Sequence, residues 1–493
     1  MNNETPGKGI PFYQNILDKR SRRVKPPKGD KAAVTAGSER GRSDGHARTD
    51  RADRTGRAGR MDREHAGPRG HHGSGPSGDR RPAPAFTPPK PAGTPVFAPL
   101  SAETHRLLDA FPDIVQGVLP LDSRRLQELP KTVRTLSHSL TDERSTRRTG
   151  YMNDPAVLSA YIRYYQWWNL VRLCRLFTNL PLDLRSGDVC ADFGSGPLTV
   201  PLALWISRPE LRALNLTWYC LDISASSLAA GEELFLSLCA RTGGSPWKIV
   251  RIKGEFGAPV RQKLRFAVSA NMFNELFWDS PQPLEELTKH HAAALAGFLE
   301  EGRAAVLLVE PGISRAGRFV SLLRDALARR GFDPSSPCPH QAACPFPGLR
   351  NGKWCHFAFD TADAPRSLHK LSEAAHLSKD RAALSYIYAC RSGEDSSLEQ
   401  TLSGSPSTVA VKNPANTDGS TSVRVVSDAI RLPHGRIGRY CCSDRGMVLL
   451  SAGRGGYDWV AGLASGAAVS IPEARKNGSE ERDEKTGALV LRI

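Results

Sequence analysis

The chain has 493 residues, ten of them cysteine, and a formal net charge of +16. The length suggests two to four domains, and neither an apolar run of about 18 residues nor a secretory signal pattern is present, so we expect a soluble intracellular protein with no membrane partner. Ten cysteines in a chain this long argue against a secreted disulfide framework and favour a metal site in a reducing compartment.

Residues 1–100 are predicted to form a disordered basic tail. They contain 20 Lys and Arg against 10 Asp and Glu. They are rich in Gly, Pro and Ser with almost no apolar periodicity, so they cannot bury enough surface to fold alone. A basic excess of this kind favours a polyanionic partner such as RNA, with salt-sensitive affinity, and a solubilising tail is the alternative.

Helical periodicity runs from residue 101 to residue 180 and predicts a helical module packed on the domain that follows. Asp154 and Pro155 mark a helix start, and the mostly apolar segment after them continues for about six turns. The aromatic residues of this helix favour core and interface packing over base-stacking platforms. They are Tyr161, Tyr164, Tyr165, Trp167 and Trp168.

The segment Val189–Pro201 reads VCADFGSGPLTVP and predicts a strand, a glycine turn and a helix start. Glycine lets bare backbone approach a ligand, and the helix N-terminus presents free N–H groups. A dinucleotide-binding loop would carry a third glycine where Thr199 stands, and Pro197 also fits it poorly. Asp192, two positions before the first glycine, is instead similar to the acidic residue in the motif of S-adenosylmethionine-dependent methyltransferases. The cofactor-binding residues predicted here are Asp192, Gly194, Ser195, Gly196 and Pro197.

Between residues 181 and 335, strands and helices alternate in the way that builds a parallel, doubly wound, Rossmann-like sheet. Ligands of open sheets lie beyond the carboxyl ends of the strands, where this sequence places Asp192, Asp222, Asn271 and Glu310. Asp222 suits the two ribose hydroxyls of an adenosyl ligand as a double acceptor. The predicted strands are Asp188–Phe193, Thr217–Leu221, Lys248–Ile252, Phe266–Ala270 and Ala304–Val309.

The group SANMFNEL follows the fourth predicted strand, where it would face the reacting methyl group of a methyltransferase. Asn271, which we also predict to contact the cofactor, or Asn274 could orient the amine of a base. The alternative is that both asparagines only cap the next helix. Cysteine is absent at this strand end, so a covalent mechanism through a thiolate has no nucleophile. The catalytic residues stay unassigned.

Cys338, Cys344 and Cys355 fall within 18 residues and are flanked by prolines, which stiffen loops and suit a rigid ligand cage. A fourth thiolate is available downstream in the pair Cys441 and Cys442. Three local cysteines and a remote one can hold either a 4Fe–4S cluster or tetrahedral zinc. Histidines beside the thiols could replace one of them as a zinc ligand, so zinc remains an alternative.

The sequence after residue 335 is predicted to form three parts. Residues 336–392 form a cysteine-rich metal-binding segment. Residues 393–427, rich in Ser, Thr, Gly and Asn, form a flexible insertion. Residues 428–493 form a C-terminal lobe that carries the fourth cysteine and a disordered end.

Four motifs together resemble the methyltransferase-like proteins associated with the small ribosomal subunit of bacteria and mitochondria. These motifs are DFGSGP, an EPG turn after the fifth predicted strand, a Cys-Pro-His to Trp-Cys-His-Phe block, and a late cysteine four residues before Gly446. The resemblance covers about residues 129–450. It implies that a 4Fe–4S cluster is held by Cys338, Cys344, Cys355 and Cys442, with Cys442 preferred over Cys441 because Gly446 matches the turn of the family.

The resemblance also implies ribosomal RNA and the small ribosomal subunit as partners. The members of this family are found in the mitochondrial matrix or in the bacterial cytoplasm. The Arg-rich extension of this chain favours the mitochondrial matrix as its location. We assign the cluster a structural role, because the three-cysteine spacing of radical chemistry on S-adenosylmethionine is absent. The leading hypothesis is an S-adenosylmethionine-dependent RNA methyltransferase that is monomeric off the ribosome. The alternatives are a non-catalytic assembly factor with the same fold and a zinc-containing RNA-binding protein.

Overall fold

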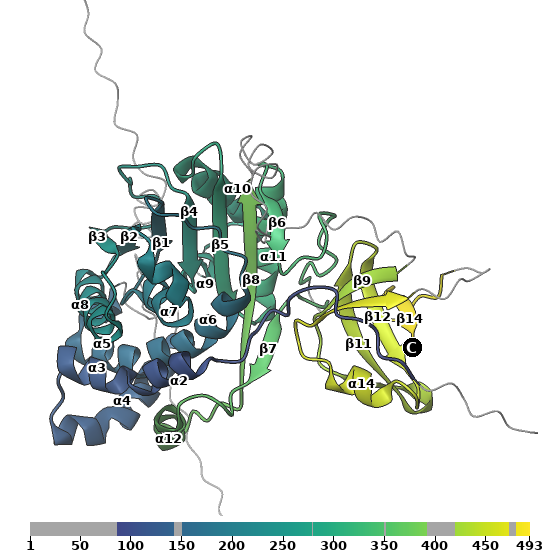
Figure 1. Cartoon of the computed structure of the whole chain (residues 1–493), viewed down its shortest axis with the longest axis horizontal. Coiled ribbons are helices and arrows are strands. Elements are labelled where there is room, and N and C mark those ends of the chain that lie inside the picture. Colours follow the sequence, from purple (N-terminus) through teal and green to yellow (C-terminus); the bar gives the residue numbers. More distant parts are fainter. Residues whose placement is uncertain (1–85, 142–149, 279, 350–351, 392–419, 473–479) are drawn as a thin grey trace, which may run out of the picture. The chain divides into compact units, whose positions relative to one another are not determined.

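The main sheet of the protein is mixed and mostly parallel (Figure 1). This computed structural model describes residues 86–141, 150–278, 280–349, 352–391, 420–472 and 480–493. The strands of the sheet are β1 (Val189–Phe193), β2 (Thr217–Asp222), β3 (Lys248–Lys253), β4 (Phe266–Ala270), β5 (Ala304–Pro311), β6 (Asp333–Ser336), β7 (Phe357–Asp360) and β8 (Arg381–Arg391).

The five predicted strands are confirmed as β1 to β5, with bounds that differ by at most two residues. The strand order is β3-β2-β1-β4-β5-β8-β6, and β7 also pairs with β8. β1 to β5 are parallel to one another, whereas β8 is antiparallel to β5. The chain reverses its direction of travel across the sheet between β1 and β4. Ligands of open α/β sheets bind beyond the carboxyl ends of the strands at such a point.

Helices alternate with these strands: α7 (Thr199–Ser207), α8 (Ala225–Thr242), α9 (Phe273–Trp278), α10 (Leu284–Phe298) and α11 (Ser314–Ala328). Helix α8 is well capped, since Ser224 accepts from the N–H of Ser227 and Gly243 ends the helix with a φ of 73°. A Cβ on Gly231 of α8 would lie 2.4 Å from the carbonyl carbon of Pro197. Glycine at this position therefore lets α8 pack directly on the turn between β1 and α7.

The helical module predicted for residues 101–180 is observed in its described part. It contains α2 (Ala102–Asp109), α3 (Phe111–Val118) and α4 (Ser123–Thr141), and a short 3-10 turn η2 (Tyr151–Asn153). A long helix follows, made of α5 (Pro155–Ala160), the π-helix η3 (Tyr161–Gln166) and α6 (Trp167–Asn179). The predicted helix start is confirmed, because the Asp154 side chain accepts from the N–H groups of Ala156 and Val157.

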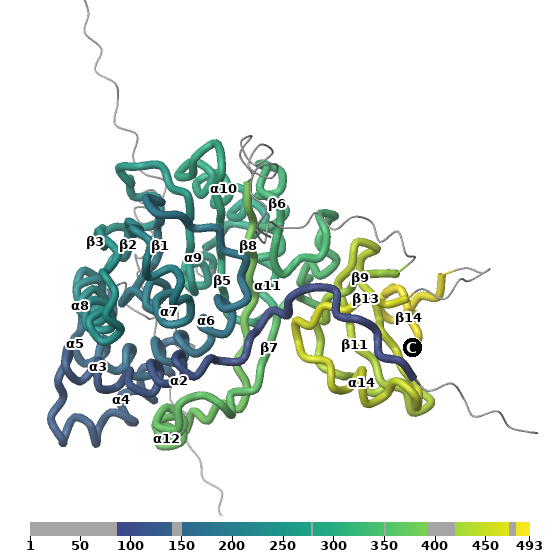
Figure 2. Tube along the Cα trace, in the orientation of Figure 1, coloured from purple at the N-terminus to yellow at the C-terminus, as the bar shows by residue number. Residues whose placement is uncertain are grey.

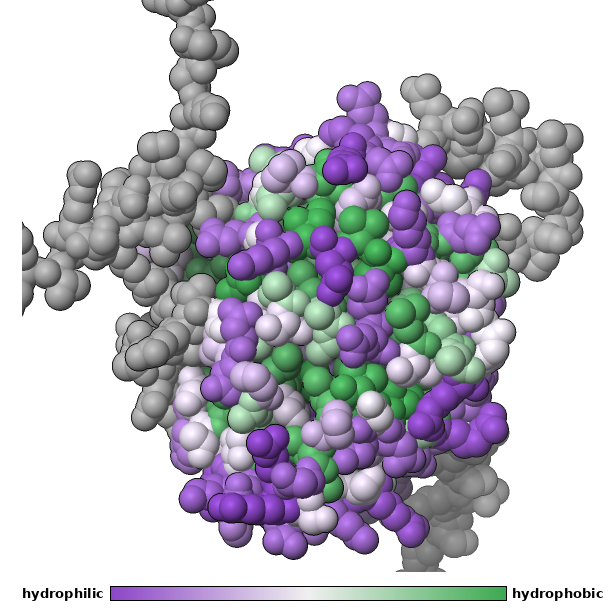
Figure 3. Space-filling view, turned by 90° about the vertical axis from the view of Figure 1, so that its left-hand side faces the viewer, coloured by the Kyte–Doolittle hydropathy of each residue, from purple (hydrophilic) through white to green (hydrophobic). Residues whose placement is uncertain are grey.

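The surface on the side of α3, α4 and α8 mixes hydrophilic with hydrophobic residues (Figure 3). Leu126 of α4 is 41% exposed and Leu236 of α8 is 46% exposed. No helix in the described ranges has the length and apolar character that crossing a membrane requires.

The predicted disordered tail, residues 1–100, ends too late in the sequence. Residues 1–85 lie outside the described residues, but residues 86–100 are packed against the rest of the protein (Figure 2). The N–H groups of Ala92 and Val96 donate to the carbonyl oxygens of Ala468 and Gly466, and Ala98 donates to Arg175. The side chain of Val96 is only 3% exposed. Composition did not predict this strap, residues 86–100, because its apolar residues are few and separated by prolines.

A second sheet forms the C-terminal part of the described chain, in the order β13-β9-β11-β12-β14, with β10 paired to β11. The helix α14 (Tyr457–Gly462) accompanies this sheet, whose own apolar core includes Val425, Val448 and Val460. The strands are β9 (Ser420–Val425), β10 (Ile430–Leu432), β11 (Arg436–Ser443), β12 (Gly446–Ala452), β13 (Ala468–Pro472) and β14 (Leu489–Arg492).

Three predicted boundaries are corrected by these strands. The predicted insertion 393–427 ends too late, because β9 pairs with β11 and β13; residues 392–419 lie outside the described residues. The predicted disordered end is wrong for β14, which pairs in parallel with β12. The predicted separate segment 336–392 is also wrong as a unit, because it contributes β7, β8 and the intervening helix α12 (Arg366–Ala374), and β7 and β8 complete the main sheet.

Candidate cofactor site and cysteine cavity

The glycine turn between β1 and α7 has the backbone that its sequence predicts. Gly194 and Gly196 have φ values of 69° and 54°, and Leu198 also has a positive φ, of 56°. A Cβ on Gly194 would lie 2.5 Å from the Cβ of Met272, so the close neighbour at this glycine is a side chain of the protein itself. A Cβ on Gly196 would meet nothing nearer than 3.9 Å. Gly196 is therefore less crowded than Gly194, with Met152 and Ser227 at ordinary contact distance from the position of a Cβ.

Asp192 lies one residue before the end of β1, and one of its carboxylate oxygens has no hydrogen bond. Its side chain is 1% exposed, and Oδ2 accepts from the Oγ of Ser195 at 2.8 Å. Oδ1 is buried and has no hydrogen-bond partner. Burial raises the pKa of Asp192 to about 8, although the hydroxyl of Ser195 and the backbone N–H of Val200 oppose the shift. A buried carboxylate with a free oxygen is costly until a donor reaches it, which fits a ligand that carries an ammonium group.

Asp222 links the glycine turn to the end of β2. Its Oδ2 accepts from the N–H of Gly196 at 2.9 Å, and its Oδ1 accepts from the N–H of Ser224 at 2.8 Å. Burial raises the pKa of Asp222, and these backbone donors oppose the shift. The predicted contact with ribose hydroxyls would therefore use the remaining lone pairs. The next residue, Ile223, is 36% exposed and offers an apolar surface beside them.

The helical module also reaches this turn, which the sequence did not predict. Met152 and Ser227 are the nearest side chains to the position of a Cβ on Gly196. The hydroxyl of Ser224 donates to the Oδ1 of Asn153 at 2.8 Å. No motif in the chain marks η2 as part of the site, because these contacts depend on the packing of η2 against α8.

Asn271 follows β4 in a strained conformation, with a φ of 64°. Its Oδ1 accepts from Nη2 of Arg172 at 2.8 Å, and the same Nη2 donates to Asn169 at 2.8 Å. The acceptor oxygen that we predicted would orient a substrate amine is thus already held by a guanidinium. Arg172 belongs to α6, and sequence reasoning missed it because it is one of several arginines in an apolar helix.

Glu310, rather than the two asparagines, caps the helix that follows β4. This residue is fully buried, and its two carboxylate oxygens accept from the N–H groups of Phe273 and Asn274, each at 3.0 Å. Burial raises the pKa of Glu310 to about 8, while the backbone donors and Arg172 oppose the shift. The side chains of Asn271 and Asn274 are therefore not needed as caps.

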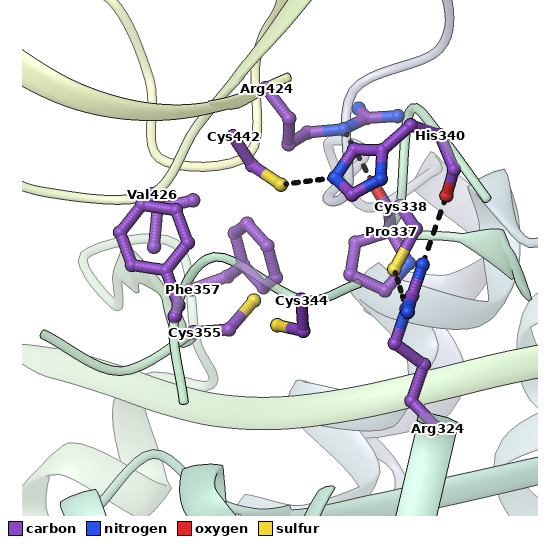
Figure 4. A pocket seen from close by; sticks show the side chains of 11 residues that line it. Arg324, Pro337, Cys338, His340, Cys344, Cys355, Phe357, Arg424, Val426 and Cys442 are labelled. Atoms are coloured by element: carbon purple, nitrogen blue, oxygen red, sulfur yellow. Dashed lines mark hydrogen bonds between the residues drawn. The ribbon is translucent and has the colours of Figure 1, made fainter. Parts of the chain in front are cut away.

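The four predicted cysteines line one cavity between the α/β part and the second sheet (Figure 4). Cys338, Cys344 and Cys355 come from the segment between β6 and β7, and Cys442 comes from β11. In Figure 4 their sulfur atoms point toward the same space. The cavity is also lined by Arg324, Pro337, His340, Phe346, Phe357, Arg424 and Val426.

The strand geometry of β11 separates the two adjacent cysteines. Successive side chains of a strand point to opposite faces, so Cys442 lines the cavity while Cys441 is buried in the core of the second sheet. Nε2 of His340 lies 3.1 Å from the sulfur of Cys442, and Nε of Arg324 donates to the sulfur of Cys338 at 3.4 Å. Burial raises the pKa of the Cys338 thiol to about 11, although Arg324 opposes the shift.

In the described ranges, no group of three or more His, Cys, Asp or Glu side chains is arranged to hold a metal ion. The described residues therefore do not show the predicted metal-binding lobe. They show four cysteine thiols that line one cavity. This donor set of four cysteines is compatible in chemistry with either iron or zinc.

The strand order identifies the class of the fold. The sheet is a mixed, mostly parallel α/β sheet ordered 3-2-1-4-5, in which the antiparallel β8 lies between β5 and β6, and this order is similar to that of the predicted Rossmann-like sheet of class I methyltransferases. Residues 281–437 match the model of a protein family described as mitochondrial small ribosomal subunit Rsm22. The predicted resemblance to a methyltransferase-like family associated with the small ribosomal subunit is thus confirmed. The matched segment includes Cys338, Cys344 and Cys355 and ends before Cys442.

Solved methyltransferase structures are similar at low identity. A methyltransferase from Thiobacillus denitrificans in complex with S-adenosyl-L-homocysteine shares 12% identity over 45% of this chain and 90% of its own, with a TM-score of 0.26. A methyltransferase from Pyrococcus furiosus shares 13% identity over 43% and 78%, with a TM-score of 0.24. No curated protein sequence matches the chain. The fold class therefore rests on the strand order itself.

Proposed function

We propose that the protein binds S-adenosylmethionine at the carboxyl ends of β1 and β2 and methylates ribosomal RNA of the small subunit in the mitochondrial matrix. The observation that carries the cofactor proposal is the buried Oδ1 of Asp192, which has no hydrogen-bond partner at the end of β1 where the glycine turn begins. The family match supports the small ribosomal subunit as the partner and mitochondria as the location. We expect the protein to be monomeric off the ribosome.

Each site residue at the carboxyl ends of β1 and β2 would hold a different part of the cofactor. Oδ1 of Asp192 would accept from the amino group of the methionine moiety. Ser195, Gly196 and Pro197 would present the backbone of the turn, Asp222 would accept from the ribose hydroxyls, and Ile223 would cover the adenine ring. Bound S-adenosylmethionine would supply an electrophilic methyl group. The side chain of Met272, which lies against Gly194, would have to leave room for it.

The cysteine cavity would hold a 4Fe–4S cluster through Cys338, Cys344, Cys355 and Cys442. Support comes from the four thiols that line one cavity, and from the resemblance to the family in which these positions hold a cluster. The role is structural, because the ligands join the α/β part to β11 of the second sheet.

A second candidate is a non-catalytic assembly factor that keeps the fold and the cofactor. The observation in its favour is that Arg172 already occupies the acceptor oxygen of Asn271. Incubation of the protein with methyl-labelled cofactor and immature small subunits separates the two candidates. Label in the RNA supports the enzyme, whereas stable binding to the subunit without label supports the assembly factor.

Two variants make this experiment specific to the site. Asp192→Asn removes the carboxylate that would bind the amino group, and we expect it to abolish labelling. Asp109→Asn changes an exposed carboxylate of α2 and serves as the matched control. If both variants label the RNA as the wild type does, Asp192 does not contribute to a cofactor site.

A further inference from the structure

Two polar side chains of the cysteine cavity contact cysteine sulfur atoms directly. Nε2 of His340 lies 3.1 Å from the sulfur of Cys442, and Nε of Arg324 donates to the sulfur of Cys338 at 3.4 Å. Both polar residues line the same cavity as the four cysteines, and Figure 4 draws both contacts. The wall of the cavity therefore carries nitrogen atoms directed at two of its four sulfur atoms.

Arg324 is held in place by every nitrogen of its guanidinium. It lies in α11 and is only 2% exposed. Nη1 donates to the carboxylate of Asp325 at 2.5 Å, and Nη2 donates to the carbonyl oxygens of His340 at 3.1 Å and Ala342 at 2.6 Å. Because a guanidinium is planar and these bonds fix its plane, the remaining Nε–H stays directed at the sulfur of Cys338.

The contact of His340 with Cys442 joins two parts of the protein. His340 is buried in the segment between β6 and β7, which supplies three of the cysteines, whereas Cys442 belongs to β11 of the second sheet. Arg324 bonds the carbonyl oxygen of His340 as well as the sulfur of Cys338. The same arginine thus supports one sulfur directly and fixes the backbone of the residue that contacts another.

The sequence leaves a histidine beside the thiols open as a zinc ligand. Four cysteines already supply all the ligands of a 4Fe–4S cluster, so His340 would lie outside the ligand set and contact one of its members. A cysteine ligand is a thiolate, which has no proton and can only accept a hydrogen bond. The ring of His340 would therefore donate from Nε2 to Cys442.

Donors of this kind have a defined electrostatic effect. Hydrogen bonds to the sulfur atoms, net charge and solvent exposure set the reduction potential of an iron–sulfur cluster. Each N–H places a partial positive charge beside a sulfur atom. It stabilises the reduced form more than the oxidised form, because the reduced form carries one more negative charge. Both donors should therefore raise the reduction potential.

We propose that His340 and Arg324 are positioning residues, which donate hydrogen bonds to Cys442 and Cys338 as ligands of the cluster and raise its reduction potential. These roles rest on the proposed 4Fe–4S cluster, and the same experiment measures first whether the cluster is present.

The test measures the midpoint reduction potential of the full-length protein, purified without oxygen. Dithionite supplies one electron per cluster, and electron paramagnetic resonance reports the reduced form; iron and acid-labile sulfide are measured on the same samples. His340→Leu removes the ring N–H, and His340→Gln keeps an N–H near the position of Nε2. His290→Leu changes an exposed histidine of α10 as the matched control. Arg324→Met keeps an unbranched side chain without a donor.

We expect His340→Leu to keep the iron and sulfide of the wild type. Its one-electron equilibrium should move toward the oxidised form by about 3- to 10-fold, which is a shift of about 30–60 mV to more negative potential at about 59 mV per tenfold change. His340→Gln should restore the potential of the wild type, and His290→Leu should not change it. Arg324→Met should shift the potential in the same direction as His340→Leu.

Equal potentials in wild type and His340→Leu would overturn the proposal and leave the cluster standing. Loss of iron from His340→Leu would also overturn it, because His340 would then be a ligand or a support of the fold. If Arg324→Met loses its iron because the loop opens, the His340 variants alone decide. A wild type that contains zinc, or no iron and sulfide, would contradict the proposed cluster itself and these roles with it.

Discussion

The two candidate sites of this protein are built in opposite ways. At the carboxyl ends of β1 and β2, a single short segment supplies Asp192, the glycine turn and the start of α7. At the cysteine cavity, three thiols of one loop need a fourth from β11, about a hundred residues away in sequence, to complete the set. The glycine turn is local in sequence but is also held by Asp222, whereas the cysteine set joins two distant elements and depends on both.

A substitution of a cysteine that lines the cavity should therefore have the largest effect on stability. Cys344→Ser removes one ligand of the proposed cluster, and we expect loss of bound iron and a decrease in the free energy of unfolding of about 3 kcal/mol or more, because metal binding and folding are coupled. Metal analysis and denaturant unfolding of anaerobically purified protein measure both effects. Cys441→Ser, at a buried cysteine that does not line the cavity, should keep the iron. Full iron content in Cys344→Ser would mean that the cavity is not the metal site.

The candidate cofactor site should make the free energy of unfolding depend on pH through Asp192. Asp192 has its pKa raised to about 8 in the folded protein and an ordinary value near 3.8 when unfolded. Between these values the folded protein holds a proton that the unfolded chain releases, so the free energy of unfolding falls as pH rises, by about 1.4 kcal/mol per unit. Asp192→Asn should reduce the slope between pH 5 and pH 7 in the ligand-free protein by this amount, and the contribution of Glu310, whose pKa is also raised to about 8, should remain. The same slope in Asp192→Asn and wild type would show that Asp192 ionises normally.

Ligand affinity at the local site should depend on Asp222. Asp222→Ala removes the acceptor of the Gly196 and Ser224 N–H groups together with the proposed ribose contact. We expect binding of S-adenosyl-L-homocysteine to weaken by about 1–3 kcal/mol in calorimetry. Asp109→Ala, on the surface of α2, is the control. Unchanged affinity in Asp222→Ala would exclude Asp222 from the site.

The smallest effect concerns the N-terminal region. Deletion of residues 1–81 should flatten the salt dependence of RNA binding without lowering the melting temperature. Deletion of residues 1–95 should also lower the melting temperature by a few degrees, because it removes part of the strap, residues 86–100, including the donor at Ala92 and the carbonyl oxygen of Thr94 that accepts from Arg424. An unchanged salt slope in the shorter deletion would show that the basic tail does not contact RNA.

This contrast also explains how much could be predicted from the sequence. The strands β1 to β5 were predicted closely, because four of them are mostly apolar runs of the kind that parallel sheets bury, and β3 carries Ile249, Val250 and Ile252 between charged residues. The turn at Gly194 and Gly196 was predicted for the same local reason. The strands β6 to β8 were missed, because β6 and β7 are only four residues long and flank the segment rich in prolines and cysteines, and because β5, the partner of β8, lies far back in the sequence.

The interactions between strand ends could not be predicted at all. Arg172 on Asn271, Glu310 as the cap of α9 and Gln166 on Pro197 each join side chains that are distant in sequence. No spacing rule connects such residues, since their contact depends on how helix and sheet pack. Cys442 was preferred over Cys441 through the family turn at Gly446, and the alternation of side chains along β11 gives the physical reason why only Cys442 reaches the cavity.

The most direct test of the central claim is a calorimetric titration of S-adenosyl-L-homocysteine into the full-length protein purified without oxygen. The account predicts one saturable site per chain, with the affinity lost in Asp192→Asn and kept in Asp109→Asn. Absence of binding in the wild type would contradict it, because the free oxygen of Asp192 and the backbone of the glycine turn would then have no adenosyl ligand to receive.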